Sequence, residues 1–310
     1  MVTGESRMGR HAVGVSILNY NSAALTRTAV ASILEKTDPA LDFRILVVEN
    51  GSSSAGRISP EEWSDARVQV VTSRINLGFA GGHQFALQFI RARYYFFFNN
   101  DAYFVNDVLR ALFDFMDACP DVGLATGRCL GADGGERPSF DYLPGLLRSL
   151  VGSGILRRIH PARYPDRHAR YERPIDVPMV TGSALFVRGD LLESLGGLDT
   201  GFFLYCEEED LARRVRTAGQ RICFVPGACF CHLGGGSMPV QLALRKEFYL
   251  SFLYYLRKHH GALYTLGFWG FLLAKLFSRA LRQKDSWALW WFVIRGAPMR
   301  ESLRFRQQMN

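Results

Sequence analysis

The segment Ala12–Leu34, AVGVSILNYNSAALTRTAVASIL, sets a pattern that much of the chain repeats. Its first seven residues are mainly apolar and include β-branched side chains, which predicts a short buried strand. Asn19–Ser22 are polar residues suited to a loop and a helix cap, and Ala23–Leu34 has the composition of a helix. The segment therefore predicts a strand, a polar turn and a helix.

The same alternation continues along the chain. A glycine-rich loop at Asn76–Gly82 leads into a predicted helix that runs through Arg91. The other predicted elements are strands at Phe43–Val48, Val68–Thr72, Tyr94–Phe98, Val122–Thr126, within Val177–Arg188 and at Arg221–Val225, and helices at Asn106–Ala118 and Asp210–Ala218. Strands that alternate with helices predict an α/β fold with a mainly parallel central sheet.

Polar residues stand where three of these strands end. Asn19 and Tyr20 follow the first strand, Glu49 and Asn50 the second, and Asn99–Asp101 the aromatic strand YYFFF. Ligands of open α/β sheets gather beyond the carboxyl ends of the strands, so we expect these residues to share one site. The glycine loop lacks the Gly-Lys-Ser/Thr of a P-loop, and it does not follow the first strand as a dinucleotide fingerprint does.

An acidic run lies within Gly201–Arg216, GFFLYCEEEDLARRVR. Glu209 and Asp210 each have an arginine four residues later, so we expect them to stabilise the start of a helix. Glu207 and Glu208 have no basic residue at that spacing. Because acids beside large apolar residues can have a raised pKa, which suits a general base, we predict that this first pair is catalytic.

Other polar residues suggest a metal and a nucleotide. Asp101 offers a hard oxygen ligand that Mg²⁺ or Mn²⁺ shares readily with substrate phosphates. His232 would add an imidazole, although a lone histidine is also common in cores and on surfaces. Glu49 would accept from a base or ribose hydroxyl, or is a solvated loop acid. Cys229-x-Cys231-His232 matches no zinc spacing, so we expect buried thiols in a strand.

The net charge of +8 is unevenly distributed. From Gln241 to the C-terminus there are twelve Lys/Arg and three Asp/Glu, while the rest of the chain has 25 basic and 26 acidic residues. This tail also holds four of the five tryptophans. Its aromatic residues lie among leucine and phenylalanine rather than in a groove-reading pattern. An anionic membrane surface is therefore a better partner than nucleic acid, which we do not expect it to bind.

The tail is predicted to be helical. Ala262–Phe277 is apolar apart from polar Thr265 and charged Lys275, and its sixteen residues fall short of the roughly 20 that span a bilayer. Interfacial attachment is therefore preferred over a span, and a helix packed on the domain is the third alternative.

Six scattered cysteines and a polar N-terminus favour a reduced, cytoplasmic setting without a signal peptide. Gly131–Asp176 is rich in Gly, Pro and Arg, which predicts a mobile excursion with an amphipathic piece at Leu146–Ile159. We expect a catalytic domain over 1–239 and a helical extension over 240–310 that associates with membrane or acceptor. The protein would then lie peripherally on the cytoplasmic face of the membrane.

Taken together, an ordered set of motifs resembles a family 2 glycosyltransferase with a GT-A fold, in the rhamnosyltransferase-like branch. The motifs span Ala12–Ser237 and are VSILNYN (15–21), VVENGS (47–52), NLGFAGG (76–82), FNND (98–101), VTGSA (180–184), FFLYCEEEDLARR (202–214) and HLGGGS (232–237). Each is weak alone, and their order is specific. The resemblance implies a Rossmann-like nucleotide-diphospho-sugar transferase fold.

The resemblance also implies the reaction. It would be an inverting transfer of a sugar, with rhamnose a candidate, from a nucleotide-diphosphate donor to a saccharide or polyprenyl-linked acceptor in cell-surface polysaccharide synthesis. Glu208 would be the base with Glu207 as its partner, and Asp101 and His232 would hold Mg²⁺ or Mn²⁺. The residues implied to bind the donor are Asn19, Tyr20, Glu49, Asn76, Gly78, Asn99 and Asp101.

Three positions depart from the family's pattern. The family usually has Asp where this chain has Glu49 and Glu208, and Asn99–Asp101 replaces a more acidic triad. Alternative functions are a noncatalytic nucleotide-sugar-binding module, a sugar nucleotidyltransferase and a basic nucleic-acid-binding protein. A nucleotidyltransferase would need a glycine-rich, basic phosphate loop near the first strand, and Asn19–Ser22 is not one. The intact acids at Asp101 and in the acidic run argue against a noncatalytic module.

Overall fold

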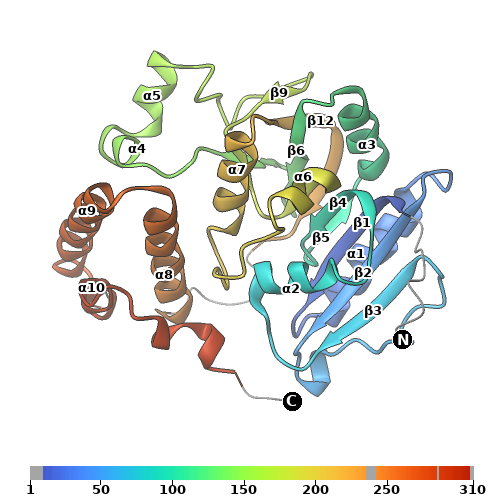
Figure 1. The fold of residues 1–310 in the computed structure, drawn as a ribbon, viewed down its shortest axis with the longest axis horizontal. Helices are drawn as coiled ribbons and strands as arrows, with labels where there is room; N and C mark the ends of the chain where they lie inside the picture. Colours follow the sequence, from blue (N-terminus) through green and yellow to red (C-terminus); the bar gives the residue numbers. More distant parts are fainter. Residues whose placement is uncertain (1–9, 235–241, 285, 308–310) are drawn as a thin grey trace, which may run out of the picture.

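The computed structural model describes residues 10–234, 242–284 and 286–307. In this part of the chain a central sheet carries helices on both faces, and the C-terminal helices lie to one side (Figure 1). The main strands are β1 (His11–Asn19), β2 (Phe43–Asn50), β3 (Val68–Ser73), β4 (Ala92–Phe98), β5 (Ala102–Phe104), β6 (Val122–Leu130), β11 (Ala184–Arg188) and β12 (Arg221–His232).

The sheet order is β3-β2-β1-β4-β11-β6-β12-β5. The first four strands are parallel, as are β6 and β12, while β11 and β5 run antiparallel to their neighbours. The predicted α/β fold with a mainly parallel sheet is therefore confirmed. Because β2, β1 and β4 are parallel neighbours, the polar residues at their carboxyl ends lie at one edge, with Asn19 in register with Glu49.

Strand β4 shows why this sheet needs two helical layers. Tyr94, Phe96 and Phe98 are buried with α1 (Ala23–Lys36) and α3 (Val108–Ala118), while Tyr95 and Phe97 are buried on the other face. A strand covered on both faces can be apolar along its whole length, as ARYYFFF is after its first two residues. The opposite layer contains α2 (Gly78–Ala86), α6 (Gly189–Ser194) and α7 (Glu207–Thr217).

Several predicted boundaries were wrong. Helix α2 ends at Ala86 rather than Arg91, and α7 begins at Glu207 rather than Asp210. Strands β6 and β12 extend well past the predicted ends because they pair with each other in parallel along most of their length. A register shift between Val225 and Cys229 lets β12 continue past Pro226 and Gly227.

The excursion over 131–176 is tied to the sheet near both ends. Strand β7 (Glu136–Arg137) pairs with β6, β9 (Ile175–Asp176) pairs with β12, and β8 (Phe140–Asp141) pairs with β10 (Met179–Val180). The predicted amphipathic piece forms two short helices, α4 (Leu146–Val151) and α5 (Ser153–Ile159), on either side of Gly152. These two helices lie outside the sheet layers (Figure 1).

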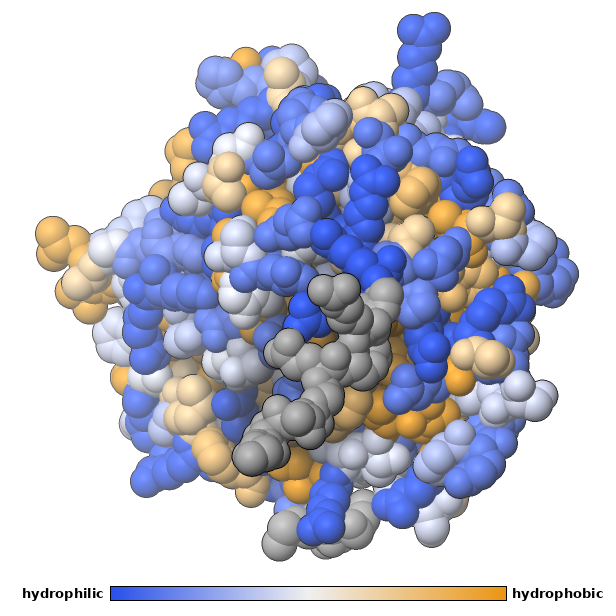
Figure 2. Space-filling view, turned by 45° about the vertical axis from the view of Figure 1, so that its right-hand side comes forward, coloured by the Kyte–Doolittle hydropathy of each residue, from blue (hydrophilic) through white to orange (hydrophobic). Residues whose placement is uncertain are grey.

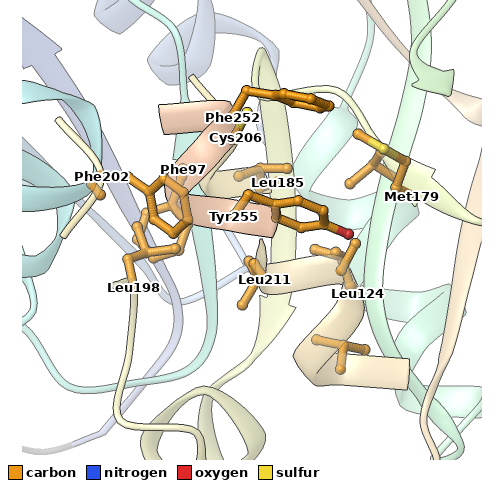
Figure 3. Packing of buried hydrophobic residues seen from close by; sticks show 14 of the residues in the cluster. Phe97, Leu124, Met179, Leu185, Leu198, Phe202, Cys206, Leu211, Phe252 and Tyr255 are labelled. Carbon is orange, nitrogen blue, oxygen red and sulfur yellow. The ribbon is translucent and has the colours of Figure 1, made fainter. Parts of the chain in front are cut away.

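The tail is helical, as predicted. It forms α8 (Leu242–His259), α9 (Ala262–Ala280) and α10 (Ser286–Ile294), followed by the short helices η2 (Met299–Glu301) and η3 (Leu303–Phe305). Tyr255 of α8 is fully buried and shares one core with Phe97, Leu124, Leu185 and Leu211 of the sheet and α7 (Figure 3). The tail therefore packs on the same hydrophobic core as the sheet.

Two further expectations concern the tail and the cysteines. Among the described residues, no helix combines the length and hydropathy needed to cross a membrane. Cys231 is buried and Cys229 half-buried in β12, as expected for strand thiols, and both are free cysteines. The expected domain boundary near residue 239 and Gly235–Ser237 of the last motif lie outside the described residues.

Candidate active site

Asn19 and Glu49 meet in the interior, below the edge of the sheet. The Asn19 amide donates to Glu49 Oε2 at 2.6 Å and to the Gly56 carbonyl at 2.8 Å. The Glu49 carboxylate also accepts from the backbone N–H groups of Ser52 and Ile58, at 2.8 and 2.9 Å. Both side chains are fully buried, so they fix the loop that follows β2 and the floor of the edge above it.

Tyr20, the next predicted donor residue, lies at the surface of the same edge. Its side chain is 44% exposed directly after β1, where Asn21 adopts a left-handed backbone conformation with φ 55°. Asn21 Oδ1 accepts from the Ser53 N–H at 2.8 Å, which joins the loops after β1 and β2. An exposed ring above a fixed polar floor is suited to contact a flat group such as a nucleobase.

The glycine loop is attached to the segment that precedes the acidic run. Asn76 Oδ1 accepts from the Gly78 N–H at 2.8 Å and from Asn50 Nδ2 at 3.1 Å. Gly78 has φ +75°, and a Cβ atom there would stand 2.1 Å from the Phe203 carbonyl oxygen. The Phe79 N–H donates to this oxygen at 2.8 Å. Glycine is required here for both conformation and space.

Asp101 and His232 lie side by side although 131 residues separate them. Antiparallel pairing of β5 with β12 brings them together, and Asp101 Oδ1 is 3.0 Å from His232 Nε2. The Asn99 amide nitrogen is 3.3 Å from the same imidazole nitrogen. The three predicted residues therefore form one half-buried cluster at the end of β4 and β12.

This cluster fits a divalent cation that is shared with a substrate. Two neighbouring ligands of an octahedral Mg²⁺ or Mn²⁺ ion, with bonds of about 2.1 Å, stand about 3 Å apart. The oxygen of Asp101 and the nitrogen of His232 have this separation, and their chemistry suits Mn²⁺. The described residues contain no group of three or more His, Cys, Asp or Glu side chains that would hold a metal alone, so substrate phosphates would supply other ligands.

The acidic run begins α7 after an unusual backbone turn. Tyr205 and Cys206 both have positive φ angles, 73° and 68°, in the left-handed region that non-glycine residues seldom adopt. Two consecutive residues in this region cost stability, and such strain is concentrated at functional sites. The turn places Glu207 inside the protein at the start of the helix. Its carboxyl group is therefore removed from the solvent that normally surrounds an acidic side chain at a helix start.

The first three carboxyl groups of α7 are crowded and poorly paired. One side-chain oxygen each of Glu207, Glu208 and Glu209 is buried without a hydrogen-bond partner among the described residues. Burial raises the pKa of Glu208, while the backbone N–H of Gly182 acts in the opposite direction. Burial and the Glu208 charge raise the pKa values of Glu207 and Glu209 well above the ordinary range.

Asp210 instead anchors α7 to the tail. Its fully buried carboxylate accepts from Arg214 at 2.7 Å, as the spacing predicted, and from Lys258 and His259 of α8 at 2.6 Å each. The predicted pair between Glu209 and the arginine four residues later was wrong. Arg213 contacts the α8 end, where its guanidinium lies 3.0 Å from His260 Nε2, because the tail packs against this face of α7.

The segment Thr181–Ala184 joins the two halves of the site. The Ser183 carbonyl accepts from the Asn99 N–H at 3.0 Å, next to the Asp101–His232 pair. A Cβ atom added at the adjacent residue, Gly182, would stand 3.3 Å from Glu208 Oε1. The base candidate and the metal-ligand candidates therefore flank one short segment of chain.

Two residues that hold the glycine loop were not predicted to bind the donor, although Asn50 was expected at the shared strand-end site. Asn50 holds the glycine loop by donating to the Gly78 carbonyl at 3.2 Å and accepting from the Leu77 N–H at 2.9 Å. Its place in the VVENGS motif was a usable signal. Gln307 donates to the Asn76 carbonyl at 2.6 Å and brings the end of the tail to the glycine loop. No sequence signal could have found this contact, because it depends on how the tail packs.

The model of the glycosyl transferase family 2 matches residues 15–196, more than half of the chain. The match begins in β1, includes the strand-end residues and the Asp101 position, and ends after α6. The chain belongs to glycosyl transferase family 2.

Two relatives share shorter regions with this family 2 member. An N-acetylglucosaminyl-diphospho-decaprenol L-rhamnosyltransferase of Mycobacterium tuberculosis is 31% identical over 127 residues, covering 39% of this chain and 41% of the relative. The UDP-Glc:alpha-D-GlcNAc-diphosphoundecaprenol beta-1,3-glucosyltransferase WfgD of Escherichia coli is 27% identical over 94 residues, covering 30% and 36%. The matched regions span less than half the length of these curated relatives.

Solved structures confirm the GT-A-like fold. A structure of GalNAc-T7 with UDP, GalNAc and Mn²⁺ aligns with a TM-score of 0.56 at 12% identity, over 80% of this chain and 48% of that chain. Staphylococcus aureus TarS 1–349 aligns with a TM-score of 0.51 at 14% identity, over 78% and 64%. At these identities the similarity establishes the fold alone.

We predict that Gly78→Ala destabilises this family 2 protein more than Gly134→Ala does. Both glycines have φ +75°, so both variants lose about 1–2 kcal/mol through the left-handed backbone. Only at Gly78 does the new methyl group meet a backbone oxygen, which adds at least about 1 kcal/mol, whereas the space at Gly134 is open. Urea unfolding followed by circular dichroism measures the difference, and equal losses would contradict the close approach.

A second prediction concerns the pH dependence of stability. Glu207 titrates near 4.5 when unfolded and well above that value in the folded protein. The folded state therefore keeps a proton that the unfolded state releases, and stability falls as pH rises from about 4.5 through the raised pKa. Glu207→Gln cannot titrate, so its unfolding free energy should fall less between pH 4.5 and neutrality. The exposed control Glu172→Gln should parallel the wild type, and a parallel Glu207→Gln profile would refute the buried ionisation.

Proposed function

We propose that this protein is an inverting glycosyltransferase that moves a sugar from a nucleotide-diphosphate donor to a saccharide linked to a polyprenyl diphosphate. The observation that carries this proposal is the arrangement around Gly182 and Ser183. Glu208 lies against Gly182. The Ser183 carbonyl accepts a hydrogen bond from the Asn99 N–H, beside the Asp101–His232 pair. A base and a diphosphate-binding cluster on either side of one segment leave a common place for acceptor and donor.

Glu208 is the base in the proposed reaction. Its carboxylate removes the proton of an acceptor hydroxyl as the oxygen attacks the anomeric carbon from the face opposite the leaving diphosphate. The C–O bond to the acceptor forms as the bond to the diphosphate oxygen breaks, so the anomeric configuration inverts without a covalent enzyme intermediate. Mg²⁺ or Mn²⁺ held by Asp101 and His232 would supply neutralising charge for the leaving group.

The neighbouring acids support this division of roles. Burial raises the pKa values of all three carboxyls, and the Glu208 charge raises those of Glu207 and Glu209 further, so the three groups are not all ionised together. A single negative charge among three carboxyls avoids the repulsion that two or three would cause. The raised pKa of Glu208 also makes it a stronger base than an exposed glutamate.

The relatives' names suggest the substrates. Both name an N-acetylglucosaminyl diphosphate linked to a polyprenol, and they differ in the sugar, L-rhamnose in one and glucose in the other. We propose the shared polyprenyl-diphosphate-linked N-acetylglucosamine as the acceptor. L-Rhamnose is the first donor sugar to test, because that relative has the higher identity over the longer match.

Replacing Glu208 by Gln should abolish transfer while the donor still binds. Loss of a general base costs about 10²- to 10⁴-fold in rate. Release of nucleoside diphosphate, measured with nucleotide-linked L-rhamnose and UDP-glucose, reports transfer, and calorimetry reports donor binding.

The matched control is Glu209→Gln. Glutamine resembles a neutral carboxylic acid, so this replacement should keep transfer within about tenfold of the wild type while removing a carboxyl from the same helix turn. Full activity of Glu208→Gln would exclude it as the base. A wild-type protein that binds the donor but transfers to no acceptor would favour the noncatalytic module.

Asp101→Ala should remove the effect of Mn²⁺ on donor affinity. The variant leaves only one of the two proposed protein ligands, so we expect donor binding in the presence of Mn²⁺ to weaken at least about tenfold. Calorimetric titrations with and without Mn²⁺ measure this change. Unchanged affinity with Mn²⁺ present would contradict the role of Asp101, and Asp114→Asn on the exposed face of α3 serves as the charge control.

A further inference from the structure

Helices α4 and α5 carry large apolar side chains that the rest of the chain leaves uncovered. Leu147, Leu150, Ile155 and Ile159 are each more than half exposed, although they belong to two helices of six and seven residues. Scattered single exposed hydrophobics are ordinary, whereas four on adjoining short helices form a patch. The face of the molecule drawn in Figure 2 is, by contrast, mainly hydrophilic.

Helix α9 continues this patch. Leu263 is 86% exposed, and Leu266, Phe277 and Leu281 follow on the same side at helical spacing. The residues between them on that side are small, while the opposite side of the helix is buried against the protein, for example through Leu272. One side of α9 is therefore apolar along its length and largely exposed, although Phe277 also contacts Trp287 and Trp290 of α10.

The two exposed surfaces adjoin each other. The Leu146 N–H at the start of α4 donates to the Tyr264 hydroxyl of α9 at 2.7 Å, so Leu147 and Leu263 stand next to a direct contact. Figure 1 shows α4, α5 and α9 along one side of the molecule. We call the exposed apolar side chains of these three helices the apolar face.

Positive charge surrounds the apolar face. Residues 144–163 contain four arginines and residues 262–284 contain four Lys/Arg, and neither segment contains an Asp or Glu. Among the described residues, Arg158 and Arg163 of the first segment and all four cations of the second form no ion pair. This is charge complementarity to a negatively charged, apolar partner.

We propose that the apolar face docks on an anionic lipid bilayer, with its leucines and isoleucines in the acyl region and its cations at the headgroups. A second copy of the chain fits less well, because a two-fold contact would bring the two sets of cations together. Leu266 also lines an apolar groove of about 540 Å³ between α8 and α9, which has the chemistry to take an alkyl or isoprenoid chain.

The position of the apolar face suits an acceptor held in the membrane. Tyr264 stacks on His260 with ring centroids 4.2 Å apart, and His260 contacts Arg213 of α7, the helix whose first turn holds the proposed base. Helix α7 has eleven residues and is about 16 Å long, so the proposed base and the Arg213 contact with the tail lie within that distance of each other along the helix. The role of docking in bringing the acceptor to the site rests on the proposed function. The docking itself does not depend on it.

The test is co-sedimentation of the full chain with phosphatidylcholine vesicles that contain or lack phosphatidylglycerol. The wild type should bind only the anionic vesicles, and less at high salt. Leu263→Glu with Leu281→Glu should weaken this binding at least about tenfold, as should Arg158→Glu with Arg282→Glu. The control Val105→Glu changes an exposed apolar residue outside the apolar face and should bind like the wild type.

Three results would overturn the proposal: no binding to anionic vesicles, equal binding to both vesicle types, or unchanged binding of the leucine pair variant. A wild-type dimer that the same variant converts to a monomer in analytical ultracentrifugation would assign the face to a second copy instead. Because sedimentation uses no nucleotide sugar, its outcome is separate from transfer. Transfer by the leucine variant to a water-soluble N-acetylglucosaminyl diphosphate should stay at the wild-type rate.

Discussion

The buried carboxylate of Asp210 is the interaction on which the arrangement of this molecule depends. It pairs with Arg214 within α7 and joins α7 to α8 through Lys258 and His259, with no exposed surface of its own. Leaving such a charge without partners costs about 3–5 kcal/mol, so α7 and α8 are fixed as a unit. The tail is thus part of the structure that orients Glu208, rather than an appendage to a finished domain.

The site is assembled from segments far apart in the chain by backbone contacts that depend on small residues. Gly78 lets the glycine loop approach the Phe203 carbonyl, and Gly182 lets the strand segment approach Glu208. The first contact reaches the segment that precedes the acidic run, and the second reaches an acid of α7 itself. A side chain at either glycine would therefore push these segments of the site apart.

The sequence was sufficient for the elements whose signal is local. Strand-end polar residues such as Asn19 and Asn99 were predictable because apolar periodicity locates the strands and parallel pairing brings their ends together. The start of α7 was not, since the left-handed turn at Tyr205 and Cys206 is imposed by tertiary packing. The predicted pair between Glu209 and Arg213 was wrong for the same reason, because helical spacing cannot reveal that the end of the α8 segment competes for the Arg213 guanidinium.

The cost of the acidic run indicates why it is retained. Consecutive left-handed residues destabilise the folded protein, as do three buried carboxyl oxygens that have no partner in the described part of the chain. Packing alone does not require them, since apolar residues of similar size in place of Glu207 would remove an unpaired polar group from the core. Local features that oppose stability are expected at functional sites, which agrees with the proposed role of this run near the Asp101–His232 pair. Asp210 follows the three crowded acids directly. Its ion pairs with Arg214, Lys258 and His259 offset part of this cost.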